Sequence, residues 1–165
     1  MELAPPTLRD LGDYRRLFTD PEVAAWVRPP PLRPMGDGEL RARLDADVQQ
    51  WRQQGWGPWV VREDGAFAGR AGLCWTEVEG RREVELAWSI VPDLQGRGLA
   101  TACARRALEW APALGIERVV ALTLVDNAAS RRVMEKAGMA FGREVVHAGL
   151  PHVLYEARPL AATAG

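Results

Sequence analysis

A glycine-containing turn carries the clearest chemical signal in this chain. It consists of Gln95, Gly96, Arg97, Gly98, Leu99, Ala100 and Thr101. The turn follows an extended run at 84–91 and opens a long amphipathic helical pattern. Because the first turn of a helix presents unpaired N–H groups and the positive end of its dipole, such a turn binds anions, most often phosphate. A tight strand-to-helix turn without a ligand would use the same residues, so this stretch alone leaves both interpretations open.

The composition of the turn favours main-chain recognition. Gly96 and Gly98 let the backbone approach a bulky anion, and Arg97 can add a charge-assisted bond. Two better-known phosphate motifs do not fit. The chain lacks the lysine of a P-loop at this turn, since its single lysine is Lys136, and the third glycine of a dinucleotide-binding motif is missing.

A second helix start follows an apolar run at 119–125. Its residues, 126–130, read Asp-Asn-Ala-Ala-Ser. Two neighbouring strand ends that each lead into a helix form the kind of crevice in which open sheets bind ligands. Asn127 is also explained as a helix cap that accepts the N–H of Ser130, but capping does not explain Ser130 itself.

Hydrophobic periodicity predicts the elements that must position these residues. Helices are expected at 10–19, 21–26 with Asp20 as N-cap, about 40–55, 99–114 and 127–137. Strands are expected at 59–61, 66–76, 83–91, 119–125, 143–147 and 153–158. This order predicts an α/β (α+β) fold, in which helices cover both faces of a mixed, mostly antiparallel, twisted sheet of six or seven strands. We expect a single domain spanning residues 1–165.

Composition and charge exclude several classes of protein. The 165 residues carry a net charge of −1, which argues against a nucleic-acid grip by bulk electrostatics. Apolar stretches such as 119–122 are far too short to span a bilayer, and the N-terminus lacks a signal-peptide pattern. Cys74 and Cys103 fit two small buried thiols better than a disulfide or metal site. We therefore expect a cytoplasmic protein with no metal, membrane or nucleic-acid partner.

Two ordered motifs resemble those of the GNAT superfamily of acetyl-CoA-dependent N-acetyltransferases. The phosphate signature Q/R-x-x-G-x-G/A is met by Gln95, Gly98 and Ala100. The signature N-x-x-S-x-x-V-x-E-K-x-G-F/M is met by Asn127, Ser130, Val133, Glu135, Lys136, Gly138 and Met139. The strand at 84–92 and the opening residues Leu17, Asp20 to Val23 and Trp26 also fit, so the likeness covers nearly the whole chain. It is greatest to the Rim-type ribosomal-protein N-terminal acetyltransferases.

The resemblance implies the GNAT fold, with acetyl-CoA as cosubstrate and no metal. It places the pyrophosphate over the main-chain N–H groups of 95–101. The pantetheine arm would pair with the edge of the third meander strand at Ile90 and Val91, where a main-chain N–H can polarise the thioester carbonyl. Asn127 would hold the arm from the opposite side.

The implied reaction is direct attack of a primary amine on the thioester. Most amines are protonated at neutral pH, so a base helps, and Glu85 is the candidate, directly or through water. Glu83 is the second candidate for the base. Without a catalytic role, Glu85 would be a surface charge on a half-exposed strand. Ser130 is the candidate partner of the leaving sulfur. Trp26 lies where this family builds its acceptor wall.

Several alternatives stay open. His147 and His152 flank 149–151, which we expect to form a turn, and one of them could act as the base. The acceptor is a protein N-terminus or a small-molecule amine. A non-catalytic CoA-binding module, or a transferase using another acyl-CoA such as succinyl-CoA, would show the same phosphate turn. Homodimers are common in the Rim-type branch, so the resemblance also implies one.

Overall fold

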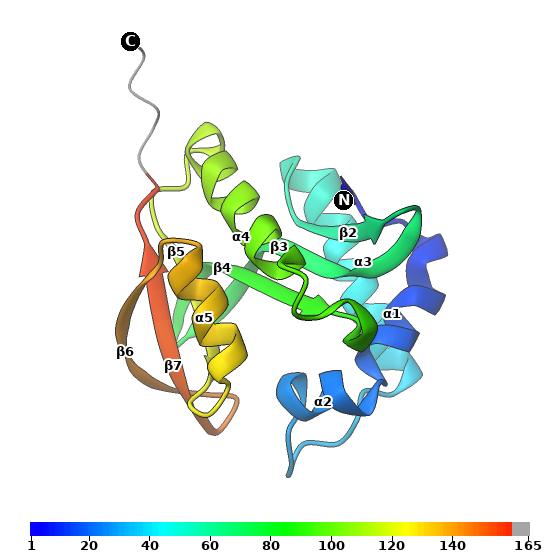
Figure 1. Cartoon of the computed structure of the whole chain (residues 1–165), viewed down its shortest axis with the longest axis horizontal. Helices are drawn as coiled ribbons and strands as arrows, with labels where there is room; N and C mark the ends of the chain where they lie inside the picture. Colours follow the sequence, from blue (N-terminus) through cyan, green and yellow to red (C-terminus); the bar gives the residue numbers. More distant parts are fainter. Residues whose placement is uncertain (160–165) are drawn as a thin grey trace. The chain divides into compact units, whose positions relative to one another are not determined.

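The computed structural model describes residues 1–159 (Figure 1). The strands are β1 (Glu2–Ala4), β2 (Pro58–Glu63), β3 (Ala66–Val78), β4 (Arg81–Ile90), β5 (Val119–Leu124), β6 (Ala140–His147) and β7 (Leu150–Ala157). The α-helices are α1 (Leu11–Phe18), α2 (Pro21–Val27), α3 (Asp37–Gln54), α4 (Leu99–Trp110) and α5 (Ala128–Lys136). Short 3-10 helices lie at Leu8–Asp10, Pro92–Leu94 and Ala111–Leu114.

The strands form a seven-stranded sheet in the order β1-β2-β3-β4-β5-β7-β6. The β1/β2, β2/β3, β5/β7 and β6/β7 pairs are antiparallel, whereas β4 and β5 run parallel and pair at Glu85 and Val120. The predicted fold class, with a mixed and mostly antiparallel sheet, is therefore confirmed. Strand β1 was not predicted, because three residues are too few to show a periodicity.

The chain divides into two compact units. The first comprises Met1–Gly72 and Trp88–Ala100, and the second comprises Leu73–Ala87 and the described residues from Thr101 onward. Each unit is described by itself below. The single domain expected from the sequence stays a prediction.

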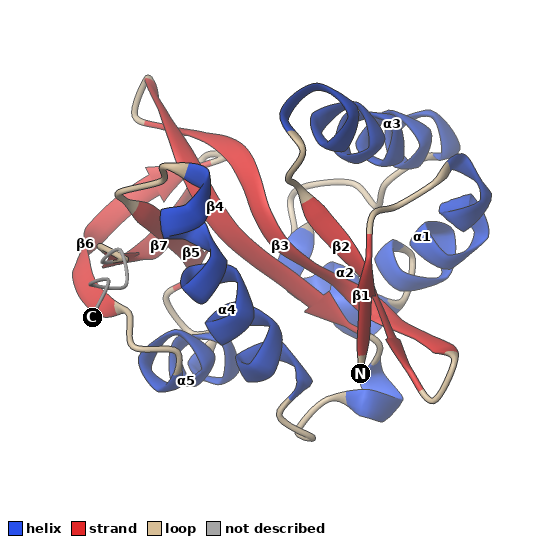
Figure 2. Cartoon of the chain, turned by 90° about the horizontal axis from the view of Figure 1, so that it is seen from above, coloured by secondary structure: helices blue, strands red, loops and turns tan. Residues whose placement is uncertain are grey.

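In the first unit, helices α1 and α3 pack against each other and share a core with the strands (Figure 2). That core includes Tyr14, Leu17, Leu40, Leu44, Val60 and Phe67. Helix α2 begins as predicted, because the Asp20 carboxylate accepts hydrogen bonds from the N–H groups of Glu22 and Val23, and Pro21 fills the first helical position.

A buried ion pair ties the first unit together. The Asp47 carboxylate of α3 accepts hydrogen bonds from the Arg70 guanidinium of β3, at 2.6 Å from Nε and 2.7 Å from Nη2. The Tyr14 hydroxyl of α1 donates to the same carboxylate at 2.7 Å. All three side chains are buried, so one carboxylate holds two helices against a strand.

In the second unit the sheet is strongly curved, so that the end of β3 contacts β6 and β7. Val78 at the end of β3 shares a buried cluster with Val145 of β6 and Leu154 of β7, although β4 and β5 lie between them in the strand order. An ion pair of 2.8 Å joins Glu79, just after β3, to Arg143 of β6. Adjacent strand residues point to opposite faces, so Leu154 faces this cluster while Tyr155 faces α5, to which it is hydrogen-bonded.

Strands β6 and β7 are longer than predicted. The turn between them is Ala148 and Gly149, which have φ values of +50° and +76°. The expected turn at 149–151 is therefore wrong, because a two-residue turn with both φ values positive suits a hairpin and leaves His147 and His152 inside the strands.

Removal of the Asp47 carboxylate should be one of the most destabilising single changes in the first unit. We expect Asp47→Ala to lower the free energy of unfolding by about 3–5 kcal/mol, because it leaves a buried guanidinium unpaired. The matched control is Arg15→Ala, which breaks the exposed Arg15–Asp37 pair and should cost less than about 1 kcal/mol. Urea denaturation measures both, and equal losses would contradict the assignment.

Candidate active site

The predicted phosphate turn links the end of β4 to the start of α4. Gly96 and Gly98 have φ values of +74° and +83°, in the left-handed region that favours glycine. Among residues 1–159, no atom other than those of the glycine and its two chain neighbours lies within 4 Å of the position that a Cβ would take at Gly96 or Gly98. The conformation, rather than crowding, therefore requires glycine here, and the space beside the turn is open. The N–H groups of Leu99, Ala100 and Thr101 begin α4, where a helix offers no internal partner.

The side chain of Gln95 anchors this turn to the strand before it. Its Nε2 donates to the carbonyl oxygen of Ile90 at 3.0 Å. Two main-chain bonds tighten the same segment, from the N–H of Leu94 to the carbonyl of Val91 and from the N–H of Gln95 to that of Pro92. Gln95 was predicted to bind the cofactor as part of a motif, and nothing in the motif indicates its contact with Ile90.

Ile90 and Val91 direct their main-chain groups to opposite edges of the strand. The N–H of Val91 donates to the carbonyl of Ala68 in β3 at 2.9 Å. Because the N–H and C=O groups of successive strand residues alternate between edges, those of Ile90 point away from β3. The strands approach closely here, since a Cβ at Gly69 of β3 would collide with the carbonyl oxygen of Ser89.

The two candidate carboxylates of β4 have different surroundings. Glu85 is half-buried and pairs with Val120 of β5 in the sheet. Glu83 is held by Arg118, whose Nη1 lies 2.6 Å from its Oε1 and whose Nη2 lies 3.0 Å from Glu156. Arg118 therefore links Glu83 of β4 to Glu156 of β7.

Asn127 and Ser130 lie together at the start of α5. The Asn127 side chain is buried, and its Oδ1 accepts the N–H of Ser130 at 3.1 Å. The capping interpretation of Asn127 is thus confirmed. Ser130 is half-buried in the first turn of the helix.

The remaining candidates are Trp26 and the two histidines. Trp26, on α2 of the first unit, is 48% exposed. His147 and His152 of the second unit face each other with ring centroids 5.3 Å apart. His152 pairs with Leu124 on β5, four residues beyond the partner of Glu85, which is about 13 Å along a strand. Neither the register nor the ring contact brings a histidine beside Glu85.

Comparison with known proteins identifies the family. A family model described as "Acetyltransferase (GNAT) domain" matches residues 1–140. The chain belongs to the GNAT acetyltransferase family. The predicted enzyme class, an acyltransferase, is thereby confirmed.

Solved GNAT structures share the fold. A GNAT-family acetyltransferase from Bordetella pertussis is 24% identical with a TM-score of 0.78, and the match covers 93% of each chain. The protein yncA from Salmonella typhimurium, solved with acetyl-CoA, is 22% identical over 100% of this chain and 97% of its own, with a TM-score of 0.75. The aminoglycoside acetyltransferase AAC(6')-Ib, solved with coenzyme A and kanamycin, is 18% identical over 94% and 93% of the two chains, with a TM-score of 0.73.

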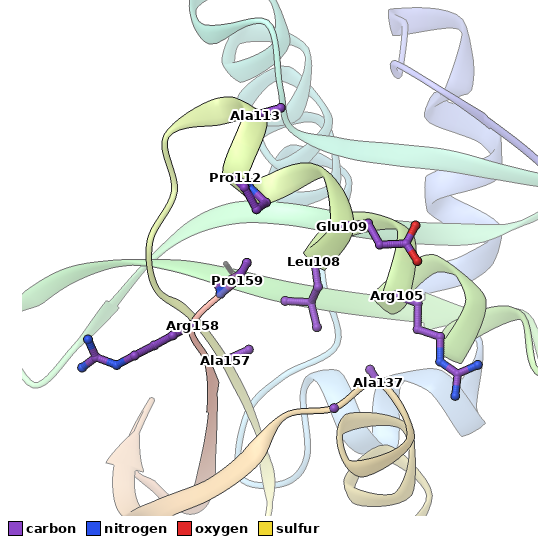
Figure 3. Close-up of a pocket in the computed structure, with 10 residues that line it drawn as sticks. Arg105, Leu108, Glu109, Pro112, Ala113, Ala137, Ala157, Arg158 and Pro159 are labelled. Carbon is purple, nitrogen blue, oxygen red and sulfur yellow. The ribbon is translucent and has the colours of Figure 1, made fainter. Parts of the chain in front are cut away.

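A cavity of about 800 Å³ lies elsewhere in the second unit of this GNAT protein (Figure 3). Its wall includes Leu108 of α4, Pro112, Ala137, Ala157 and Pro159. These residues lie toward the carboxyl ends of α4 and α5, away from the helix start that carries Asn127 and Ser130. The cavity therefore does not contain the predicted catalytic residues.

The described residues offer neither a metal-binding cluster nor a membrane-spanning helix. Within residues 1–159, no three His, Cys, Asp or Glu side chains gather so that they could hold a metal ion. No helix in the same range is both long and apolar enough to cross a membrane.

The Asn127 cap on α5 should contribute to the free energy of unfolding of this GNAT protein. Asn127→Ala should lower the free energy of unfolding by about 1 kcal/mol, since it removes the acceptor of the Ser130 N–H. Asn127→Ser keeps a neutral acceptor oxygen of similar capping preference, so it should stay within about 0.5 kcal/mol of the parent. Urea denaturation of both variants checks this, and equal destabilisation would show that Asn127 does not stabilise α5 as a cap.

Proposed function

We propose that this GNAT protein transfers an acetyl group from acetyl-CoA to a primary amine, by direct attack and without a covalent enzyme intermediate. The observation that carries the proposal is the turn at Gly96 and Gly98. Its left-handed glycines stand beside open space and lead directly into α4. This arrangement suits a diphosphate bound by main-chain N–H groups, with Arg97 contributing a charge-assisted bond.

The thioester end of the donor is assigned to Ile90. The N–H of Val91 is used by Ala68, whereas the main-chain groups of Ile90 point to the opposite edge of β4. The N–H of Ile90 is therefore the group proposed to meet the thioester oxygen as negative charge develops there. Val91 contributes to the site by fixing that edge. Asn127 is proposed to hold the pantetheine arm in addition to capping α5.

Glu85 is proposed as the base and Ser130 as the sulfur partner. Glu85 accepts the proton of the attacking amine, directly or through water, as the nitrogen bonds to the thioester carbon. The carbon–sulfur bond then breaks, and the leaving thiolate, hydrogen-bonded by Ser130, takes up a proton from water while Glu85 gives its proton back to water. Glu83 remains the alternative base.

The acceptor is proposed to be a protein N-terminus or a small-molecule amine. Trp26, half-exposed on α2, is assigned to the acceptor wall. The motifs at 95–100 and 127–139 favour the Rim-type branch, and with it a cytoplasmic homodimer. The structure with kanamycin concerns AAC(6')-Ib alone and makes aminoglycosides one arm of the test.

Turnover with matched carboxylate variants tests the catalytic proposal. Release of CoA thiol is measured with acetyl-CoA and a panel of peptides, polyamines and aminoglycosides. Glu85→Gln should lower kcat by about 100-fold at neutral pH, since general-base catalysis is typically worth that much. Ser130→Ala should lower it roughly tenfold, the loss of about one hydrogen bond in the transition state. The control Glu83→Gln should change it less than about threefold, because Glu85 rather than Glu83 is proposed to accept the proton.

The outcomes of this screen separate the alternatives. Full turnover in both Glu85→Gln and Ser130→Ala would refute the catalytic assignment. Tight CoA binding with no thiol release from any amine would indicate a non-catalytic binding module. Faster turnover with succinyl-CoA would replace acetyl as the transferred group.

Calorimetry with CoA tests separately whether the main-chain N–H groups of the turn bind the diphosphate. Gly98→Ala should weaken CoA binding about tenfold or more, because an L-residue in the left-handed region costs about 1–2 kcal/mol and displaces the turn. Arg97→Ala should have a smaller effect. Gly38→Ala, in α3 with nothing near its Cβ position, should leave affinity unchanged. Equal affinity in Gly98→Ala and the parent would overturn the assignment of the phosphate to this turn.

A further inference from the structure

One buried hydroxyl holds the helix that carries Asn127 and Ser130. The Tyr155 hydroxyl of β7 donates to Oε1 of Glu135 at 3.0 Å and accepts from Nε of Arg131 at 3.3 Å. Arg131 also donates through Nη1 to the carbonyl of Val125, at the end of β5, at 3.3 Å. A single phenol thus contacts two successive turns of α5.

The phenol itself is fixed by the sheet. Tyr155 is 2% exposed and pairs with Ala121 of β5 on one side and with Phe141 of β6 on the other. The Phe141 ring packs edge-on against the Tyr155 ring, with centroids 5.7 Å apart. Because β7 is paired along both edges, the hydroxyl occupies a defined point relative to β5.

Two bonds from one point constrain the rotation of α5 about its axis. Arg131 and Glu135 are four residues apart, so they lie on the same face of the helix. The bond from Arg131 to Val125 adds a link to the chain just before Asn127. Asn127 in turn holds the N–H of Ser130, so the network reaches the first turn of the helix through consecutive contacts.

We propose that Tyr155 is a positioning residue for acetyl transfer, which sets the orientation of Asn127 and Ser130 through Arg131 and Glu135. The proposal rests on the function proposed for those two residues. Tyr155 does not touch the reacting atoms. Its contribution is that Ser130 and Asn127 are held in place before the donor binds.

The chain supplies a matched control, since it contains two tyrosines. Tyr14 is buried like Tyr155, and its hydroxyl also donates to a carboxylate, that of Asp47, which an arginine holds. Burial raises the pKa of the Tyr14 phenol well above its usual value, so its hydroxyl stays protonated. Tyr14 bonds α3 rather than α5, so Tyr14→Phe removes an equivalent hydrogen bond from the other compact unit.

The experiment compares Tyr155→Phe and Tyr14→Phe in CoA affinity, kcat and amide hydrogen exchange. We expect Tyr155→Phe to lower kcat/KM about five- to tenfold, because a small displacement of positioned groups is costly to the rate. We also expect faster exchange at residues 128–131. Tyr14→Phe should lose stability while keeping kcat/KM and the exchange of that segment within about twofold of the parent.

Two substitutions of Glu135 on α5 test the same hydrogen bond from the helix side. Glu135→Gln retains an oxygen that can accept from Tyr155 and should stay close to the parent in kcat/KM. Glu135→Ala should reproduce the loss of Tyr155→Phe. Equal losses in the glutamine and alanine variants would contradict a role that acts through this hydrogen bond.

A double-mutant cycle with Ser130→Ala tests whether Tyr155 acts through Ser130. Independent effects multiply, so the double variant would lose the product of the two factors. We expect the double variant to lose less than this product, because part of the effect of Tyr155 acts through the Ser130 hydroxyl.

The outcomes distinguish the two proposals. If Ser130→Ala keeps full activity, the catalytic role of Ser130 is refuted. Faster hydrogen exchange at residues 128–131 in Tyr155→Phe would then still support a role of Tyr155 in holding α5, and unchanged exchange would contradict it. If Tyr155→Phe matches Tyr14→Phe in every readout, or if its effect multiplies with that of Ser130→Ala, Tyr155 is structural only and the positioning proposal is overturned.

Discussion

The candidate site depends on the alternation of main-chain groups at the end of β4. Val91 gives its N–H to Ala68 and is fixed to β3. Its neighbour Ile90 faces the opposite edge, and its carbonyl receives the side chain of Gln95. A shift of one residue in this register would exchange the two edges. The close approach of β3 at Gly69, where no Cβ fits, secures the register against such a shift.

Each compact unit uses the same kind of polar anchor. In the first, a tyrosine and an arginine share the carboxylate of Asp47. In the second, Arg131 and Glu135 both bond the hydroxyl of Tyr155. In both cases a buried polar group ties a helix to a strand at one point, which apolar packing alone does not specify. Buried groups of this kind are costly when unpaired, so they select a single arrangement of the helix.

The sequence predicted those parts of the fold that local signals determine. Helix α2 followed from the Asp20 cap, and the start of α5 followed from Asn127, because capping involves residues two or three apart. Strand β1 exists only through its pairing with β2, which lies more than fifty residues away. The Asp47–Arg70 pair spans 23 residues, and neither residue type is a usual core candidate. In the site, motifs indicated Gln95 and Asn127, while the contact of Gln95 with Ile90 depends on a turn geometry that spacing does not reveal.

The bond from Gln95 to Ile90 has a consequence for donor selection. It joins the turn proposed for the diphosphate to the residue proposed for the thioester, within one compact unit. The separation between the two sub-sites is therefore fixed by covalent chain and one hydrogen bond. A donor fits only if the distance between its diphosphate and its thioester matches this separation. Binding of the nucleotide portion, although remote from the chemistry, therefore determines the position of the acyl carbon.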